Sequence, residues 1–120
     1  MPELSDISSW EEDMDSTKIR ELNDAFRTSF IGGQIMLTSG VTNLPPRISA
    51  ALLEDVKTFH TFTKDNDPNA EHDFGSIAID EAKFFWKIDY YDASLEFGSP
   101  DPSDPAVTSR VLTIMCADEY

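Results

Sequence analysis

The sequence has little of the features that place a protein outside the cell or in a membrane. Its 120 residues include one cysteine, Cys116, so no internal disulfide can form, as is usual in the reducing cytoplasm. No apolar run approaches the ~20 residues that a membrane-spanning helix needs. The amino terminus is acidic, whereas a secretory signal begins with basic and then apolar residues. These absences predict a cytoplasmic protein with no membrane partner.

Basic residues are also scarce. The chain has 9 Lys and Arg residues against 23 Asp and Glu residues, which gives a formal net charge of −14. The acids are concentrated, since residues 1–17 carry six acids and no base, and residues 61–104 carry eleven acids and three bases. Such a surface repels the phosphates of nucleic acids and attracts basic proteins. We therefore expect no direct binding to nucleic acid, and a basic protein surface as the partner.

Hydrophobic residues are present in sufficient number for one core. They make up 40% of the chain and include 8 phenylalanines, and a chain of this length is the size of one ordinary domain. Residues 1–15 have no apolar period and are dense in Asp, Glu and Ser, which predicts a mobile acidic arm. Residues 16–120 are predicted to form a single domain.

Two helices are expected in the first half of this domain. The first should begin after Asp15 or Ser16, since either side chain can cap free amide groups. The second should begin at Pro45-Pro46, because proline is tolerated in the first turn of a helix. The apolar stripes at helical spacing are Ile19, Leu22 and Phe26 in the first helix, and Ile48, Leu52, Val56 and Phe59 in the second.

Strands are expected at residues 34–38, 76–80, 83–91 and 110–117, from short β-rich runs bounded by turn residues. In the third of these strands the period of two places Trp86 on one face, with Lys87 and Asp89 on the other. The order helix, strand, helix and three strands predicts an α+β domain. We expect an antiparallel sheet of about four strands with two helices packed on one face.

Three separated blocks of the sequence resemble a known family. They are DNDPNAEHDFG (65–75), FFWKIDYYD (84–92) and DPAVTSRVLTIMCADEY (104–120). The family is bacterial, is known only as a domain of unknown function, and is common on plasmids and other mobile elements. The resemblance extends over about residues 20–120, including the GG and LPP positions. It implies a cytoplasmic bacterial protein of the kind found on mobile DNA, and it assigns neither an activity nor catalytic residues to this chain.

Residues 63–75 have no period and are predicted to form a long ordered loop. Oxygen-bearing side chains alternate along it as ligands do at the start of an EF-hand calcium loop, at Asp65, Asp67, Asn69, Glu71 and Asp73. The match then fails, because Ala70 stands where that loop requires glycine and Ser76 where it requires a bidentate glutamate. We therefore expect a loop organised by its own Asp and Asn side chains, with no bound metal.

His72 lies between two acidic residues of the same loop. A histidine beside carboxylates can be a structural group held by hydrogen bonds, a general base, or half of a metal site. The structural role is the one we expect, with no catalytic residue and no cofactor. The alternative is a small metal-dependent enzyme centred on His72 with Asp67, Glu71, Asp73 and Asp89.

The function that the charge pattern favours is binding to a basic surface of another protein, of the kind that binds nucleic acid. Carboxylates spaced along loops can stand in for phosphates, so a protein of this type on a mobile element would be a DNA mimic. Its expected partner is a host nucleic-acid-binding complex, such as a restriction or CRISPR system. The predicted binding face consists of Asp65, Asp67, Glu71, Asp73, Asp89, Asp92, Asp101 and Asp104.

Overall fold

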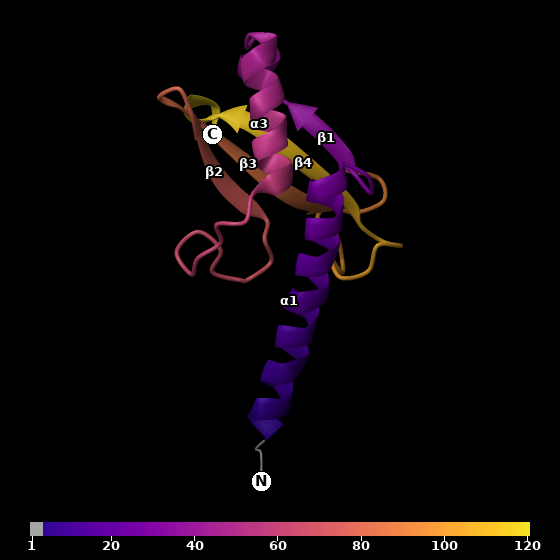
Figure 1. The fold of residues 1–120 in the computed structure, drawn as a ribbon. Coiled ribbons are helices and arrows are strands. Elements are labelled where there is room, and N and C mark those ends of the chain that lie inside the picture. The colour runs from indigo at the N-terminus through magenta and orange to yellow at the C-terminus, as the bar shows by residue number, and fades with distance from the viewer. Residues whose placement is uncertain (1–3) are drawn as a thin grey trace.

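A computed structural model of the chain describes residues 4–120, with side chains described from Asp15 onward. Helices lie against one side of a four-stranded sheet with the strand order β1-β4-β3-β2 (Figure 1). The α+β class predicted from the sequence is confirmed. The elements in chain order are α1 (Leu4–Ser29), β1 (Gln34–Leu37), α2 (Ser39–Thr42), α3 (Pro46–Thr58), β2 (Phe74–Ile79), β3 (Ala82–Tyr91), β4 (Ser109–Cys116) and the 3-10 turn η1 (Ala117–Glu119).

The first helix begins earlier than the sequence predicts. It starts at Leu4 rather than after Asp15 or Ser16, so it includes most of the predicted acidic arm. Asp6 lies in the first turn of this helix, where a negative charge interacts favourably with the helix dipole. The mobility of residues 1–15 stays a prediction.

The sheet is mixed, which corrects the antiparallel sheet expected from the sequence. β1 pairs in parallel with β4, with Gln34 opposite Val111 and Leu37 opposite Ile114. The β2–β3 and β3–β4 pairs are antiparallel. The reason is that α3 carries the chain back past the sheet before β2 begins, so β1, β2 and β4 run in the same direction. The structure also adds a helix that was not expected, the single turn α2, whose Val41 is buried.

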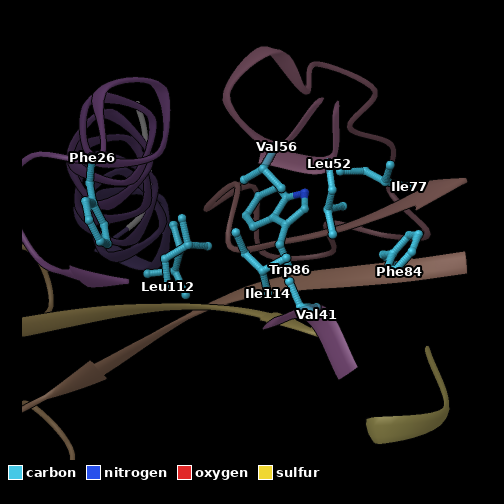
Figure 2. Packing of buried hydrophobic residues seen from close by; sticks show 10 residues of the cluster. Phe26, Val41, Leu52, Val56, Ile77, Phe84, Trp86, Leu112 and Ile114 are labelled. Carbon is cyan, nitrogen blue, oxygen red and sulfur yellow. The ribbon is translucent and has the colours of Figure 1, made fainter. Parts of the chain in front are cut away.

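The core lies between the sheet and the helices α1 and α3. Figure 2 shows Val56 of α3 above the sheet residue Trp86 and Phe26 of α1 farther to the left, and all three are nearly inaccessible to solvent. Of the stripes predicted for the two helices, Ile19, Phe26, Leu52 and Val56 are buried, and Leu22, Ile48 and Phe59 are half-buried. Both helices therefore contribute their predicted apolar faces to the core.

The strand β3 alternates as predicted. Trp86 is fully buried on the core face, whereas Lys87 and Asp89 share the opposite face, where their side chains form an ion pair of 3.1 Å. The turn before β3 consists of Asp80 and Glu81, with φ of 49° and 72°. Left-handed values at both positions are those of a type I′ turn, the form that matches the twist of a two-residue hairpin.

Candidate functional site

The two acid-bearing loops, residues 59–73 and 92–108, lie at the same end of the sheet on either side of α1 (Figure 1). One follows α3 and the other connects β3 to β4. Their positions matter because seven of the eight predicted binding acids belong to these loops, and Asp89 lies near the end of β3. The structure thus brings the predicted acids to one end of the domain.

A buried amide connects these loops to the body of the protein. The side chain of Asn23, which is inaccessible to solvent, donates to the carbonyl oxygen of Glu71 at 2.9 Å and to the hydroxyl of Tyr90 at 2.8 Å. Its Oδ1 accepts a hydrogen bond from Nε of Arg110 at 2.8 Å. Arg110 also donates to the carbonyl oxygen of Pro102. One helix, two strands and both loops therefore meet at a single group, which we call the Asn23 hub.

The members of the hub keep definite donor and acceptor roles. The hydroxyl of Tyr90 donates to Oε1 of Glu71 at 2.8 Å, and burial, followed by the nearby Glu71 carboxylate, raises the pKa of Tyr90 far above its usual value. Burial lowers the pKa of Arg110, whose guanidinium lies 5.2 Å from the centre of the Tyr90 ring. A carboxylate is an acceptor only, so the Tyr90 hydroxyl donates to Glu71, and this hydrogen bond holds the Glu71 side chain in one orientation.

His72 is held by groups from two elements. Its Nδ1 lies 2.9 Å from Oδ1 of Asp24 in α1, and its Nε2 lies 3.7 Å from Oδ2 of Asp67 in its own loop. The imidazole stacks on Phe62, with ring centres 3.7 Å apart. Asp67 is buried and accepts the backbone N–H groups of Glu71 and His72. The carboxylate contacts expected for His72 are present, although its partner Asp24 was not foreseen. The structural role of His72 stays a prediction.

A shallow hollow of about 390 Å³ lies beside this histidine. Its lining consists of Phe62, Thr63, Lys64, Asp67, Ala70 and His72. Both ring nitrogens of His72 are directed at carboxylates, Nδ1 at Asp24 and Nε2 at Asp67. The alternative of a metal-dependent enzyme centred on His72 stays a hypothesis.

The carboxylates around Asp73 are crowded. Burial raises the pKa of Asp73, and the neighbouring charges of Glu71, Asp67 and Asp89 raise it further. Among the residues whose side chains are described, Glu71 and Asp73 have no basic group within ion-pair distance, whereas Asp67 has His72 and Asp89 has Lys87. We call these four acids the Asp73 cluster. Two of these four carboxylates have a basic partner, so the negative charge of the cluster is only partly neutralised.

Replacement of Asp73 by asparagine should stabilise the protein at neutral pH. The pKa of Asp73 is raised in the folded state, so the ionised carboxylate lowers the free energy of unfolding at pH values above that pKa. Well below the ordinary value of 3.8 the carboxyl is protonated in both states and this destabilisation disappears. Thermal melts of Asp73→Asn should therefore show a higher Tm at pH 7 and a gain that falls towards zero as the pH drops below 3.8. The matched control is Asp65→Asn at an exposed position. A gain that is the same at pH 7 and pH 3 would contradict the proposed charge crowding.

Three of the predicted acids have a local role in the loop 92–108. Oδ1 of Asp92 accepts from the Ser94 hydroxyl and from two backbone N–H groups. Oδ1 of Asp101 accepts from the backbone and hydroxyl of Ser103, and Oδ1 of Asp104 from the backbone of Ala106. These hydrogen bonds lower the pKa values of Asp92 and Asp101. The largest contribution comes from the Ser94 hydroxyl at Asp92 and from the Ser103 hydroxyl at Asp101. A part in binding stays a prediction for these residues and for the exposed Asp65.

A group of possible metal ligands occurs elsewhere in the described part of the chain. One ligand atom each of Cys116, Asp118 and Glu119 lies within 4.8 Å of the others. The Glu119 carboxylate, however, already accepts hydrogen bonds from the Thr38 hydroxyl and from the backbone N–H groups of Gly40 and Cys116, which lower its pKa to about 2. Burial raises the pKa of the Cys116 thiol to about 11. The Glu119 carboxylate thus connects the ends of β1 and β4.

Sequence reasoning missed the residues that hold the site together, Asn23, Asp24, Arg27 and Arg110. One signal was present, because Asn23 is a polar residue within the apolar stripe that runs from Ile19 to Phe26. Arg27 gave no such signal, yet it is buried beside Trp86 and Phe62 and donates to the carbonyl oxygen of Val56 at 2.9 Å.

Comparisons with known proteins give one match. A family model described as "Protein of unknown function (DUF3768)" matches residues 37–119, which is more than half of the chain. This range includes both acid-bearing loops, whereas Asn23 and Asp24 of α1 lie outside it. No curated protein and no solved structure matches the chain significantly. Among the described residues, none of the helices is both long and apolar enough to cross a membrane.

Proposed function

The chain belongs to the DUF3768 family, and we propose that it is a small acidic interaction protein that binds a basic surface of another protein. The observation that carries the proposal is the Asp73 cluster. The negative charges of Glu71, Asp67 and Asp89 raise the pKa of Asp73, and Glu71 and Asp73 have no basic partner within ion-pair distance among the residues whose side chains are described. Neighbouring like charges lower the stability of a folded protein, and a basic partner would remove that cost.

The Glu71 carboxylate is also held in place before any partner arrives. The Asn23 hub fixes the backbone of Glu71 and the carbonyl of Pro102, and Tyr90 fixes the Glu71 carboxylate. A preorganised surface loses less conformational entropy on binding than a flexible one, so more of the electrostatic attraction appears as affinity. Rigid, closely spaced carboxylates can occupy the positions of successive phosphates on a basic protein. We therefore infer a DNA-mimic mode of binding.

The finer proposal concerns the kind of partner. A basic surface that would accept such a mimic is the nucleic-acid-binding face of a host complex. For a protein carried by a mobile element, the complexes worth blocking are host defence systems that attack foreign DNA. The support for this step is the charge pattern together with the resemblance of residues 65–75, 84–92 and 104–120 to a family common on mobile elements.

The proposal can be tested by affinity capture from a bacterial lysate, followed by binding kinetics with the captured protein. The variant Glu71→Gln/Asp73→Asn removes two charges while keeping the side-chain shapes, including an acceptor for Tyr90. The control Glu54→Gln/Asp55→Asn removes two charges from exposed positions on α3. Because complementary charge mainly speeds association, we expect the first variant alone to slow association by about 3–10-fold at low salt.

Two results would contradict the proposed function. One is a partner that associates equally fast at low and high salt, since attraction between exposed charges is screened by ions. The other is equal slowing by the Asp73-cluster variant and the α3 variant, which would show that total charge matters and the location of the cluster does not.

A further inference from the structure

Among the residues that the structure describes, no strand pairs with the outer edge of the sheet at β1. β1 lies at one end of the strand order, and its parallel pairing with β4 uses one side of the strand (Figure 1). An edge strand presents unpaired backbone N–H and C=O groups to any other strand that can approach. Natural proteins usually protect such an edge with charged side chains, proline or a bulge. Residues Gln34–Leu37 contain neither charge nor proline.

The sequence on either side of β1 contains no charged residue over a long stretch. Residues 28–46 contain no Asp, Glu, Lys or Arg, in a chain where 27% of the residues are charged. Large apolar side chains are nevertheless exposed there, with Ile31 at 78%, Met36 at 53% and Leu37 at 38%. The carboxylate of Glu119 lies near the end of the strand, where Thr38 and Gly40 already bind it. This combination is typical of a surface that another chain covers.

The opposite edge of the sheet, at β2, differs because acidic residues lie at both ends of the strand. β2 is followed directly by Asp80 and Glu81 and preceded by Asp73. Two copies of the chain that met along β2 would bring these acids together. Each copy carries a net charge of −14, so two copies repel each other over most approaches. Pairing at the β1 edge adds no contact between acids of that edge, so only the long-range repulsion between the two copies remains.

We propose that β1 pairs with β1 of a second copy of this chain, antiparallel about a two-fold axis, so that the two four-stranded sheets become continuous. The strand is complementary to itself in this arrangement. With the axis at Met36, the two Met36 side chains lie opposite each other and Ile35 lies opposite Leu37 of the second copy. Each pair is apolar and keeps its own face of the sheet, as a two-fold axis through a strand requires.

The test is sedimentation equilibrium of the full chain over a range of concentrations. The wild-type chain should shift from monomer to dimer. The variant Met36→Lys, which would place two lysines opposite each other, should stay a monomer where the wild type is a dimer. The control Ser76→Lys makes the same change of net charge at an exposed position on β2 and should dimerise like the wild type.

Salt separates this proposal from the proposed function. Self-association of two acidic copies through an uncharged edge should become tighter as salt screens their repulsion, whereas binding of the Asp73 cluster to a basic partner should become weaker. A wild-type chain that is monomeric up to about 1 mM would overturn the β1 pairing. So would a dimer that survives Met36→Lys, or one that Ser76→Lys abolishes. None of these results affects the proposal of a basic partner.

Discussion

Replacement of Trp86 by alanine is expected to lower the free energy of unfolding by about 3–5 kcal/mol. The indole is fully buried and lies against Phe59, Phe62 and the guanidinium of Arg27. Its removal would eliminate a large apolar surface and leave a cavity beneath α3 that the surrounding side chains can fill only in part. Since small proteins are stable by only about 5–15 kcal/mol, the loss should be conspicuous in denaturant unfolding followed by circular dichroism.

Two companion variants make this result interpretable. Trp86→Phe keeps most of the volume and should cost clearly less than Trp86→Ala. Leu52→Ala removes a fully buried side chain of α3 and should cost about 2–5 kcal/mol. If Leu52→Ala melted within a degree of the wild type, the packing of α3 on the sheet would be wrong.

Replacement of Arg110 by methionine is the second change with a large expected effect, a loss of about 3–5 kcal/mol. Arg110 is 4% exposed, and its guanidinium donates to Oδ1 of Asn23 and to the carbonyl of Pro102. Methionine keeps a similar apolar stem but supplies no donor, so the buried Asn23 oxygen would lose its partner. An unsatisfied buried polar group costs the desolvation energy in addition to the lost hydrogen bonds.

Because Asn23 and Arg110 are joined in the Asn23 hub, the stability lost on replacing Arg110 should overlap with the stability lost on replacing Asn23. In a double-mutant cycle, Asn23→Leu and Arg110→Met should show a coupling energy of about 1–3 kcal/mol, because each removes the same hydrogen bond. Arg47→Met is the control, since Arg47 is exposed and its ion pair with Asp80 lies on the surface, where such pairs contribute about 0–1 kcal/mol. Additive losses in the cycle would show that the two residues do not act as a unit.

The elements predicted best are those whose signals are local. Pro46 opens α3 as expected, and the β2–β3 hairpin turns at Asp80-Glu81, where the predicted strands 76–80 and 83–91 meet. Side chains two apart in a strand, or three to four apart in a helix, share a face whatever packs against them. Phe26, Leu52, Val56 and Trp86 could therefore be assigned to the core from spacing alone, and the structure buries all four.

The candidate site was predicted only in part. The organisation of the loop 59–73 by its own side chains follows from the turn-forming chemistry of Asp and Asn, and Asp67 binds two backbone N–H groups as that chemistry implies. The separation of the eight acids into two kinds did not follow from their positions in the sequence. Asp92, Asp101 and Asp104 bind their own loop, whereas Glu71 and Asp73 meet Asp67 and Asp89 in one cluster.

The sequence by itself determined the net charge, the helical and strand faces, the turn before β3 and the membership of an α+β class. The tertiary structure alone decided that β1 lies parallel to β4, that Asn23 meets Arg110 across 87 residues, and that Asp24 meets His72 across 48. The physical reason is the range of the forces involved. Local patterns reflect backbone sterics and burial of neighbouring side chains, whereas contacts across long loops depend on which closure of the whole chain satisfies every buried polar group at once.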